Sequence, residues 1–183
     1  MTTLRPSVTD RDHQAGNYNS TLTLVEYGDY QCAHCRRAYS FVERLLKEHG
    51  SEIKFVFRHF PLTDMHPKAI TAAQSAEAAG AQGNFWEMHR LLFENQNRFD
   101  ERTVFLHLAD KLGLQISQFF VDLKNNETIS KVEKDFKGGV YSGVRETPTF
   151  FINESKVYTY DGSYPSLLSA VEPFIANLLP IAD

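Results

Sequence analysis

Two cysteines separated by two residues are the part of this sequence best suited to chemistry. The segment reads Cys32-Ala33-His34-Cys35, and these are the two cysteines that the chain holds. Residues three apart on an α-helix lie about 5–6 Å apart on one face, close enough for a disulfide with little backbone movement. The spacing therefore predicts a dithiol that can open and close reversibly.

The apolar pattern that follows predicts a helix beginning at this dithiol. Apolar residues recur at helical spacing from Cys35 to Leu46, and the pattern closes at His49-Gly50. The unpaired N–H groups and the dipole of a helix N-terminus favour an anion, so we expect a lowered thiol pKa at Cys32, the candidate nucleophile. Cys35, one turn into the helix and on its buried face, is the candidate resolving residue.

Two titratable side chains near the dithiol are further candidates for the catalytic site. His34 lies between the cysteines, where an imidazolium or an N–H donor would stabilise the Cys32 thiolate; a solvent-facing histidine without that role is the alternative. Glu26 interrupts an apolar segment, and burial would raise its pKa unless it found a partner. It is a candidate for proton exchange with Cys35, and the alternative is a carboxylate at the rim of the site that faces water.

A metal site explains the cysteines less well. Structural zinc takes about four ligands. The chain has no second pair of cysteines at this spacing, and none of its seven histidines are spaced as a typical histidine ligand pair. We therefore expect neither a metal nor an organic cofactor. Two inert, buried cysteines remain as a structural alternative.

Strand patterns lie on both sides of the predicted helix. Residues 21–27 are rich in strand-forming side chains and stop at Gly28-Asp29, which predicts a core strand ending in a turn. Residues 53–60 alternate as a second strand. The crossover of such a strand–helix–strand unit is expected to be right-handed and parallel.

The rest of the chain divides into a helical block and a C-terminal unit. The pattern is helical from residue 67 to residue 141, with breaks that indicate four or five helices. Residues 149–152 and 157–160 then predict a hairpin, and residues 163–179 predict a last helix. At 183 residues we expect one domain over 1–183, with an N-terminal arm at 1–19 that has room for one short edge strand, and a helical insertion at about 64–142.

Composition bears on partners and location. The formal charge is −4, and no block is rich in Lys and Arg, so we expect no nucleic-acid partner. No run reaches the roughly 20 apolar residues that span a bilayer, and residues 1–20 have no apolar core typical of a signal peptide. The expectation is therefore a cytoplasmic protein, or a periplasmic one if a leader has been removed.

The segment from Glu26 to Cys35, Glu-Tyr-Gly-Asp-Tyr-Gln-Cys-Ala-His-Cys, resembles the active-site segment of DsbA-like proteins in the thioredoxin superfamily. In that family an acidic residue precedes the first cysteine by six. Residues 57–62, the helical insertion, and residues 143–152 with their Thr-Pro-Thr agree with the family in order and spacing. The resemblance covers nearly all of residues 21–179, and it implies a bacterial protein.

This resemblance implies a particular fold and a particular proline. The fold is α/β and thioredoxin-like: a central mixed sheet flanked by helices, with an all-helical insertion between its βαβ half and its ββα half. The Thr147-Pro148 bond is expected to be cis and to lie against the dithiol, where the backbone of Thr147 pairs with an extended substrate. Arg58 is expected either to pair with Glu26 beneath the site or to lie at the surface.

The activity implied is thiol-disulfide exchange with cysteine-containing polypeptides, together with an unidentified redox partner. The dipeptide Ala33-His34 departs from the best-known periplasmic oxidases, which have proline first, and this argues against a strongly oxidising role. Two alternatives stay open: a glutathione-dependent transferase or isomerase, whose members typically lack the second cysteine, and a polypeptide-binding or chaperone module with a vestigial dithiol. The direction of electron flow and the oligomeric state are not determined by the sequence.

Overall fold

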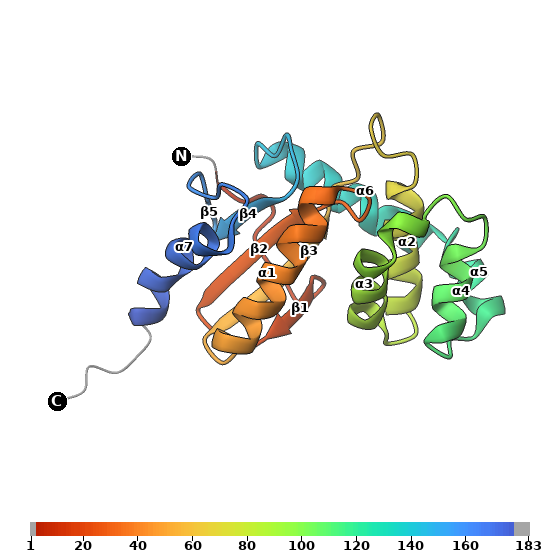
Figure 1. Ribbon diagram of the computed structural model, residues 1–183, viewed down its shortest axis with the longest axis horizontal. Coiled ribbons are helices and arrows are strands. Elements are labelled where there is room, and N and C mark those ends of the chain that lie inside the picture. Colours follow the sequence, from red (N-terminus) through yellow and green to blue (C-terminus); the bar gives the residue numbers. More distant parts are fainter. Residues whose placement is uncertain (1–2, 178–183) are drawn as a thin grey trace.

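The computed structural model describes residues 3–177, and within them five strands form one sheet (Figure 1). The strand order is β1-β3-β2-β4-β5, with β2 and β3 parallel and the other neighbours antiparallel. The strands are β1 (His13–Gly16), β2 (Leu22–Gly28), β3 (Ile53–His59), β4 (Thr149–Ile152) and β5 (Ser155–Lys156). The sheet is therefore mixed, as the resemblance implied, and β1 is an edge strand contributed by the N-terminal arm.

The helices flank this sheet and fill the long connection between β3 and β4. They are α1 (Ala33–His49), α2 (Ala69–Gly80), α3 (Phe85–Glu94), the short 3-10 helix η1 (Gln96–Arg98), α4 (Val104–Lys111), α5 (Ile116–Asp122), α6 (Asn126–Tyr141) and α7 (Tyr164–Ala176). The predicted helical insertion is thus confirmed as α2 to α6. None of the helices in residues 3–177 has the length and apolar composition needed to cross a membrane.

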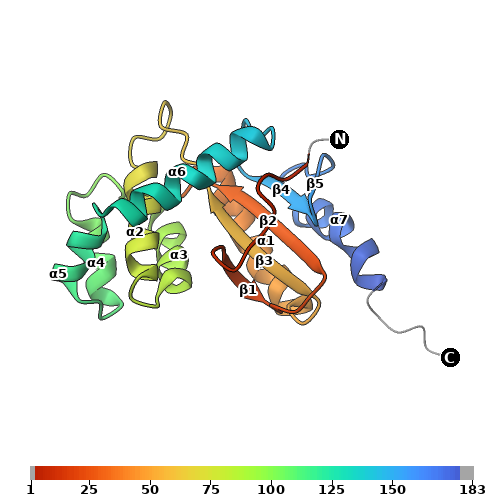
Figure 2. The same ribbon diagram turned by 180° about the vertical axis from the view of Figure 1, so that it is seen from behind.

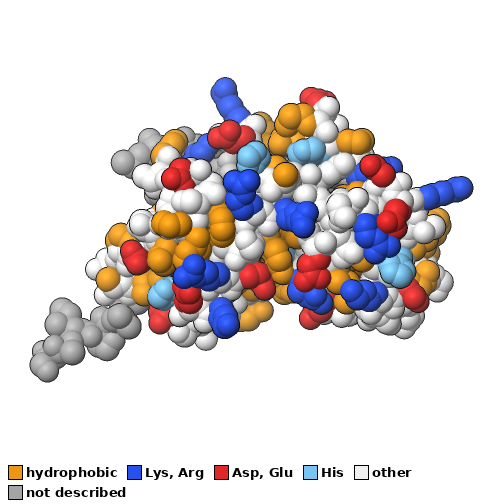
Figure 3. Space-filling model, viewed as in Figure 1, with side chains coloured by type: hydrophobic (Ala, Val, Ile, Leu, Met, Phe, Trp, Pro, Cys, Tyr) orange, Lys and Arg blue, Asp and Glu red, His pale blue; other side chains and the backbone are white. Residues whose placement is uncertain are grey.

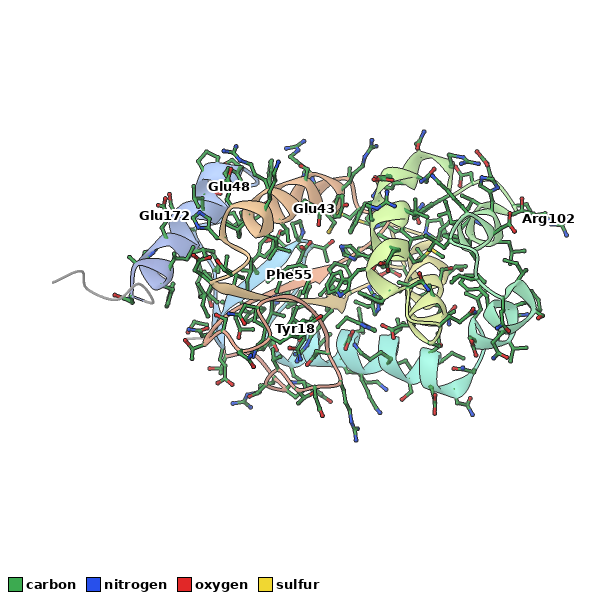
Figure 4. All side chains as sticks on the ribbon, turned by 90° about the horizontal axis from the view of Figure 1, so that it is seen from below. Tyr18, Glu43, Glu48, Phe55, Arg102 and Glu172 are labelled. Atoms are coloured by element: carbon green, nitrogen blue, oxygen red, sulfur yellow. The ribbon has the colours of Figure 1, made fainter. Side chains whose placement is uncertain are left out.

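Alternation along the strands separates two hydrophobic cores. Leu24 and Phe55 belong to the core on the α1 and α7 side, whereas Val25 and Val56, one residue further along, belong to the core on the other side. The long helix α6 covers that second face, as Figure 2 shows from behind and Figure 4 from below. A Cβ atom at Gly139 would lie 2.5 Å from the Phe60 ring, so glycine there lets α6 approach the sheet closely.

The predicted C-terminal hairpin is shorter than expected. The second strand lies at Ser155–Lys156, not at 157–160, and pairs with Phe151 and Ile152. Tyr160 packs edge-on against Phe150 at 4.9 Å from a segment outside the sheet. The alternating pattern at residues 157–160 therefore reflects side-chain packing and not strand pairing. Strand propensity is largely a measure of such packing. The last helix begins at Tyr164, and residues 178–179 of its predicted extent lie outside the described residues.

A buried ion pair holds the N-terminal arm against the sheet. The guanidinium of Arg58 donates from Nε and Nη2 to the Asp12 carboxylate at 2.8 and 3.0 Å. It also donates to the Tyr27 hydroxyl at 3.1 Å and to the backbone carbonyls of Pro6 and Ser7 at 2.8 and 3.2 Å. These contacts use the full donor set of the side chain and fix the arm beside α6.

Both expectations for Arg58 were therefore wrong, because it is buried and its carboxylate partner is not Glu26. The register explains the difference: β2 and β3 pair Glu26 with Phe57 and Tyr27 with Arg58. Successive side chains of a strand point to opposite faces, so Arg58 shares the face of Tyr27 and lies across the sheet from Glu26.

Charged side chains elsewhere are distributed rather than segregated. On the face seen in Figure 3, Lys and Arg side chains are interspersed with Asp and Glu side chains over α1 and the insertion. Elsewhere on the surface, Lys137 and Glu133 of α6 form an exposed ion pair 3.1 Å apart. Such pairs are screened by water and contribute little to stability.

Removing the Asp12 carboxylate should destabilise the fold strongly. In an Asp12→Ala variant the buried Arg58 charge loses its partner, so we expect the free energy of unfolding in urea to fall by about 3 kcal/mol. The matched control is Glu133→Ala, which removes an exposed carboxylate from an ion pair and should change the unfolding free energy far less. Equal losses in the two variants would contradict the role assigned to the Asp12–Arg58 pair.

Candidate active site

The turn that joins β2 to α1 carries the first cysteine. The backbone N–H of Cys32 donates to the Asp29 carbonyl at 3.1 Å, and the Gln31 N–H donates to Asp29 Oδ1 at 2.7 Å. Asp29 Oδ2 accepts from the Leu62 N–H and contacts His66 Nδ1, both at 2.8 Å. Asp29 therefore shapes the turn and ties it to the loop after β3, as aspartates do in turns.

The structure brings both cysteines to the start of α1, as predicted. Both thiols are free; Cys32 is the N-cap residue, 6% exposed, and Cys35 lies in the first turn, fully buried. The Asp29 N–H donates to Cys35 Sγ at 3.4 Å. The two sulfurs thus sit in different environments although they are three residues apart.

These environments shift the two thiol pKa values in opposite directions. A hydrogen bond with the Cys35 thiol, opposed by partial burial and supported by Thr147 and the backbone N–H groups of Cys35 and His34, lowers the pKa of Cys32 to about 5. Burial, the same hydrogen bond and the Glu26 charge raise the pKa of Cys35 well above its ordinary value. Cys32 is the thiolate near neutral pH and Cys35 the protonated thiol.

His34 is exposed, and its contribution to the Cys32 pKa comes from its backbone N–H. The imidazole therefore faces solvent at the mouth of the site. A role for this ring in turnover stays a prediction.

Glu26 is buried beneath the dithiol, and no residue in the described range 3–177 forms an ion pair with it. The residue is 2% exposed, and its Oε1 atom has no hydrogen-bond partner. Burial, with a smaller effect from the Cys32 charge, raises the pKa of Glu26 to about 8. The carboxyl group lines a pocket of about 230 Å³ between α1 and α3, together with Glu43 and Phe55, which are labelled in Figure 4. The interpretation of Glu26 as a rim carboxylate was wrong.

The cis-proline loop closes the other side of the dithiol. The Thr147-Pro148 bond is cis, as the resemblance implied, and the Thr147 carbonyl oxygen lies 3.5 Å from Cys32 Sγ. The Thr149 hydroxyl donates to the Glu146 carbonyl at 2.7 Å and fixes the loop before β4. The buried Thr147 hydroxyl has no other hydrogen-bond partner among the described residues, so it is free to donate to the Cys32 thiolate and lower its pKa. Backbone and side chain of Thr147 therefore adjoin the reactive sulfur.

The helical insertion contributes residues that the sequence did not indicate. The Tyr30 hydroxyl lies 2.9 Å from His89 Nδ1 on α3. The Gln96 side-chain amide donates to the backbone carbonyls of Tyr30 and Cys32 at 2.8 and 2.9 Å. Asp29 could have been recognised from its place after a strand and a glycine, but Gln96 is 64 residues from Cys32 and no local pattern marks it.

A second cluster of titratable side chains joins the insertion to the sheet. Glu77 on α2 accepts from His59 Nε2 at 2.7 Å and lies 3.0 Å from His13 Nε2. Burial opposes ionisation of Glu77, but hydrogen bonds from the two histidines outweigh it and lower its pKa. In residues 3–177 no group of three or more His, Cys, Asp or Glu side chains is arranged to hold a metal ion.

Comparison with known proteins agrees with this geometry. A family model described as Thioredoxin matches residues 8–172. The chain belongs to the thioredoxin family. BdbD from Bacillus subtilis, solved in its oxidised form, superposes with a TM-score of 0.78 at 21% identity, covering 90% of this chain and 93% of that one. Alpha-DsbA1 from Wolbachia pipientis superposes with a TM-score of 0.79 at 17% identity, covering 97% of each chain.

These likenesses establish that this thioredoxin-family chain has the fold of DsbA-like proteins. Among curated bacterial relatives, a Na(+)/H(+) antiporter NhaA 1 from Salinispora arenicola is 41% identical over 155 residues. That match covers 85% of this chain but 23% of the relative. The chain spans about a quarter of the length of such relatives, so their antiporter name describes much larger proteins.

The lowered pKa of Cys32 can be measured directly. Titration of the reduced protein, followed by the ultraviolet absorbance of the thiolate, should give a midpoint near pH 5. A Cys32→Ser variant should lose this transition. A Cys35→Ala variant should shift the midpoint upward, because it removes the hydrogen bond from the Cys35 thiol to the Cys32 sulfur. A midpoint in the ordinary thiol range for the wild-type protein would contradict the assignment of Cys32 as the stabilised anion.

The opposite pKa shifts of Cys32 and Glu26 predict how the stability of the reduced protein depends on pH. Stability from the lowered Cys32 pKa is lost as pH falls through about 5. Stability associated with the raised Glu26 pKa is present below the ordinary glutamate range and is lost as pH rises through about 8. The two dependences offset each other between these values.

A Glu26→Gln variant should remove the opposing Glu26 dependence and leave those of Cys32 and of buried His89, whose pKa is lowered to about 3. In the reduced state its free energy of unfolding should rise between pH 5 and pH 8 more steeply than that of the wild type, by up to about 1.4 kcal/mol per pH unit, the contribution of one titrating group. Urea unfolding at several pH values under reducing conditions measures this slope. Glu133→Gln, at an exposed carboxylate, should keep the wild-type profile, and an unchanged profile in Glu26→Gln would mean that Glu26 does not titrate as described.

Proposed function

We propose that this chain is a thiol-disulfide oxidoreductase that exchanges disulfides with cysteine-containing polypeptides. The observation that carries the proposal is the asymmetry of the dithiol: an anionic Cys32 that keeps a small exposed fraction lies beside a protonated, fully buried Cys35. Nucleophilic attack requires the thiolate, and release requires a second thiol within reach. Two inert structural cysteines would not need pKa values moved in opposite directions.

In the reducing direction, the Cys32 thiolate attacks one sulfur of a substrate disulfide. A mixed disulfide forms, and the other substrate sulfur leaves as a thiolate that takes up a proton. Cys35 then loses its proton to ionised Glu26 and attacks the Cys32 sulfur. The Cys32–Cys35 disulfide forms, the second substrate thiol leaves, and two electrons have passed to the substrate. Oxidation of a substrate dithiol runs the same steps in reverse.

The cis-proline loop supports binding of an extended polypeptide. Thr147 adjoins Cys32 Sγ, so a substrate backbone lying along Thr147 as an added strand would present its sulfur to Cys32. Main-chain recognition of this kind favours many cysteine-containing sequences over one. The redox partner that restores the dithiol or the disulfide would use the same edge.

The Cys32 pKa also bears on the direction of exchange. Stabilising the thiolate stabilises the reduced form, which makes the disulfide a better oxidant. The pKa of about 5 lies between the thiol pKa of thioredoxin, about 7, and that of DsbA, about 3.5. We therefore infer a reduction potential between about −270 and −120 mV. In a cytosol poised at about −220 to −320 mV, a pair at the oxidising end of the inferred range would be held largely reduced.

The two alternatives receive less support from the site. A glutathione-dependent transferase or isomerase has no need of Cys35, whose burial and contact with Asp29 are specific. A chaperone module would need the peptide-binding surface but no thiolate. A chaperone module would bind a peptide that lacks cysteine and would show no disulfide exchange. A binding assay with such a peptide therefore distinguishes the chaperone alternative from an oxidoreductase.

The reduction potential and covalent trapping test the proposal together. Equilibration with glutathione buffers, read by thiol alkylation, should give a reversible Cys32–Cys35 disulfide in the inferred range. With a disulfide-bearing peptide, Cys35→Ser should accumulate a mixed disulfide at Cys32, whereas Cys32→Ser should form none. Absence of a reversible disulfide in the wild-type protein would eliminate the oxidoreductase proposal.

A further inference from the structure

The turn that carries Cys32 is held by a side chain from the helical insertion. Gln96 opens the 3-10 helix η1, between α3 and α4, and is half-buried. Its Nε2 group donates to the Tyr30 carbonyl at 2.8 Å and to the Cys32 carbonyl at 2.9 Å. A side-chain amide carries two N–H donors, so both are committed to this turn.

The contacted carbonyls lie where they affect the sulfur most. The Cys32 carbonyl also accepts the Arg36 N–H at 3.1 Å, which is the first hydrogen bond of α1. Gln96 therefore fixes the residue at which the turn becomes the helix. The position of Cys32 Sγ relative to the N–H groups of His34 and Cys35 depends on that junction.

We propose that Gln96 is a positioning residue for the dithiol: its amide orients the two turn carbonyls and so keeps Cys32 Sγ where the start of α1 stabilises a thiolate. Gln96 acts through the Cys32 backbone and takes no part in sulfur chemistry. The inference rests on the proposed thiol-disulfide exchange and names a residue that controls it. Because Gln96 belongs to the helical insertion, the insertion also influences the reactive sulfur.

The direction of the effect follows from the dipoles. The positive, N–H end of the amide faces Cys32, and it neutralises the negative ends of two carbonyl groups beside the thiolate. Without the amide, those carbonyl dipoles oppose the anion and the turn is freer to move. The thiolate, and with it the reduced form, should then become less favourable.

The first experiment replaces the amide with an apolar group of similar size. In a Gln96→Leu variant, the thiol pKa of Cys32 should rise, and the equilibrium constant with glutathione should shift toward the protein disulfide by about 3- to 10-fold, the range expected for the loss of one or two hydrogen bonds. The matched control is Asn97→Leu, at the exposed neighbour on the same turn, which should leave both values unchanged.

A second variant separates positioning from a general structural effect. In Gln96→Glu the introduced carboxylate has no N–H donors and repels the thiolate, so its shift should exceed that of Gln96→Leu at neutral pH and shrink as the carboxyl group is protonated. Equal, pH-independent shifts in the two variants, or wild-type values in both with an unchanged unfolding temperature, would overturn the inference. If Gln96→Leu fails to fold, Gln96→Asn, too short to reach both carbonyls, takes its place with the same expected direction.

The same measurements distinguish this inference from the proposed function. A wild-type protein that forms no reversible disulfide would mean that the proposed function is wrong. A wild-type protein with the expected disulfide, together with Gln96 variants that match it, would mean that only the assignment of Gln96 is wrong.

Discussion

Stabilising an anionic sulfur at the N-cap of α1 is the constraint on which the rest of the site depends. Two backbone N–H groups of that helix, the Cys35 thiol and Thr147 all contribute to the low pKa of Cys32. These groups come from the turn after β2 and from the loop before β4, and β2 and β4 are neighbours in the sheet. Pairing of those two strands therefore brings the cis-proline loop to the dithiol, and neither segment forms the site alone.

The insertion stabilises the same turn from the other side. Tyr30 reaches His89 on α3, and Gln96 binds the carbonyls on either side of Gln31. The His59–Glu77–His13 cluster attaches the same helical block to β1 and β3. The insertion is thus fixed to the sheet by a largely buried cluster of titratable side chains and to the turn by hydrogen bonds, so hydrogen-bonded elements surround the residue whose position controls reactivity.

Local patterns in the sequence predicted the parts of the molecule that local physics controls. The dithiol at the start of α1, the strands β2 and β3, and the helical insertion all follow from periodicity and spacing. The cis form of Thr147-Pro148 required the family resemblance, because most X–Pro bonds are trans. Gln96 and the Asp12–Arg58 pair were not predicted, since each contact joins segments that are distant in sequence and only the packed fold specifies them.

The failed expectation for Arg58 explains the behaviour of Glu26. A basic residue on the same face as Glu26 would have kept the carboxyl group ionised, with a lowered pKa. Strand alternation instead places Arg58 on the far face, where it binds the arm, and leaves Glu26 buried without an ion-pair partner among the described residues. Because its pKa is about 8, the Glu26 carboxyl group keeps its proton up to that pH. A buried thiol must gain and lose its proton in the same pH range. A difference of one residue along the paired strands thus places the structural ion pair on one face of the sheet and the titratable acid beneath the dithiol on the other.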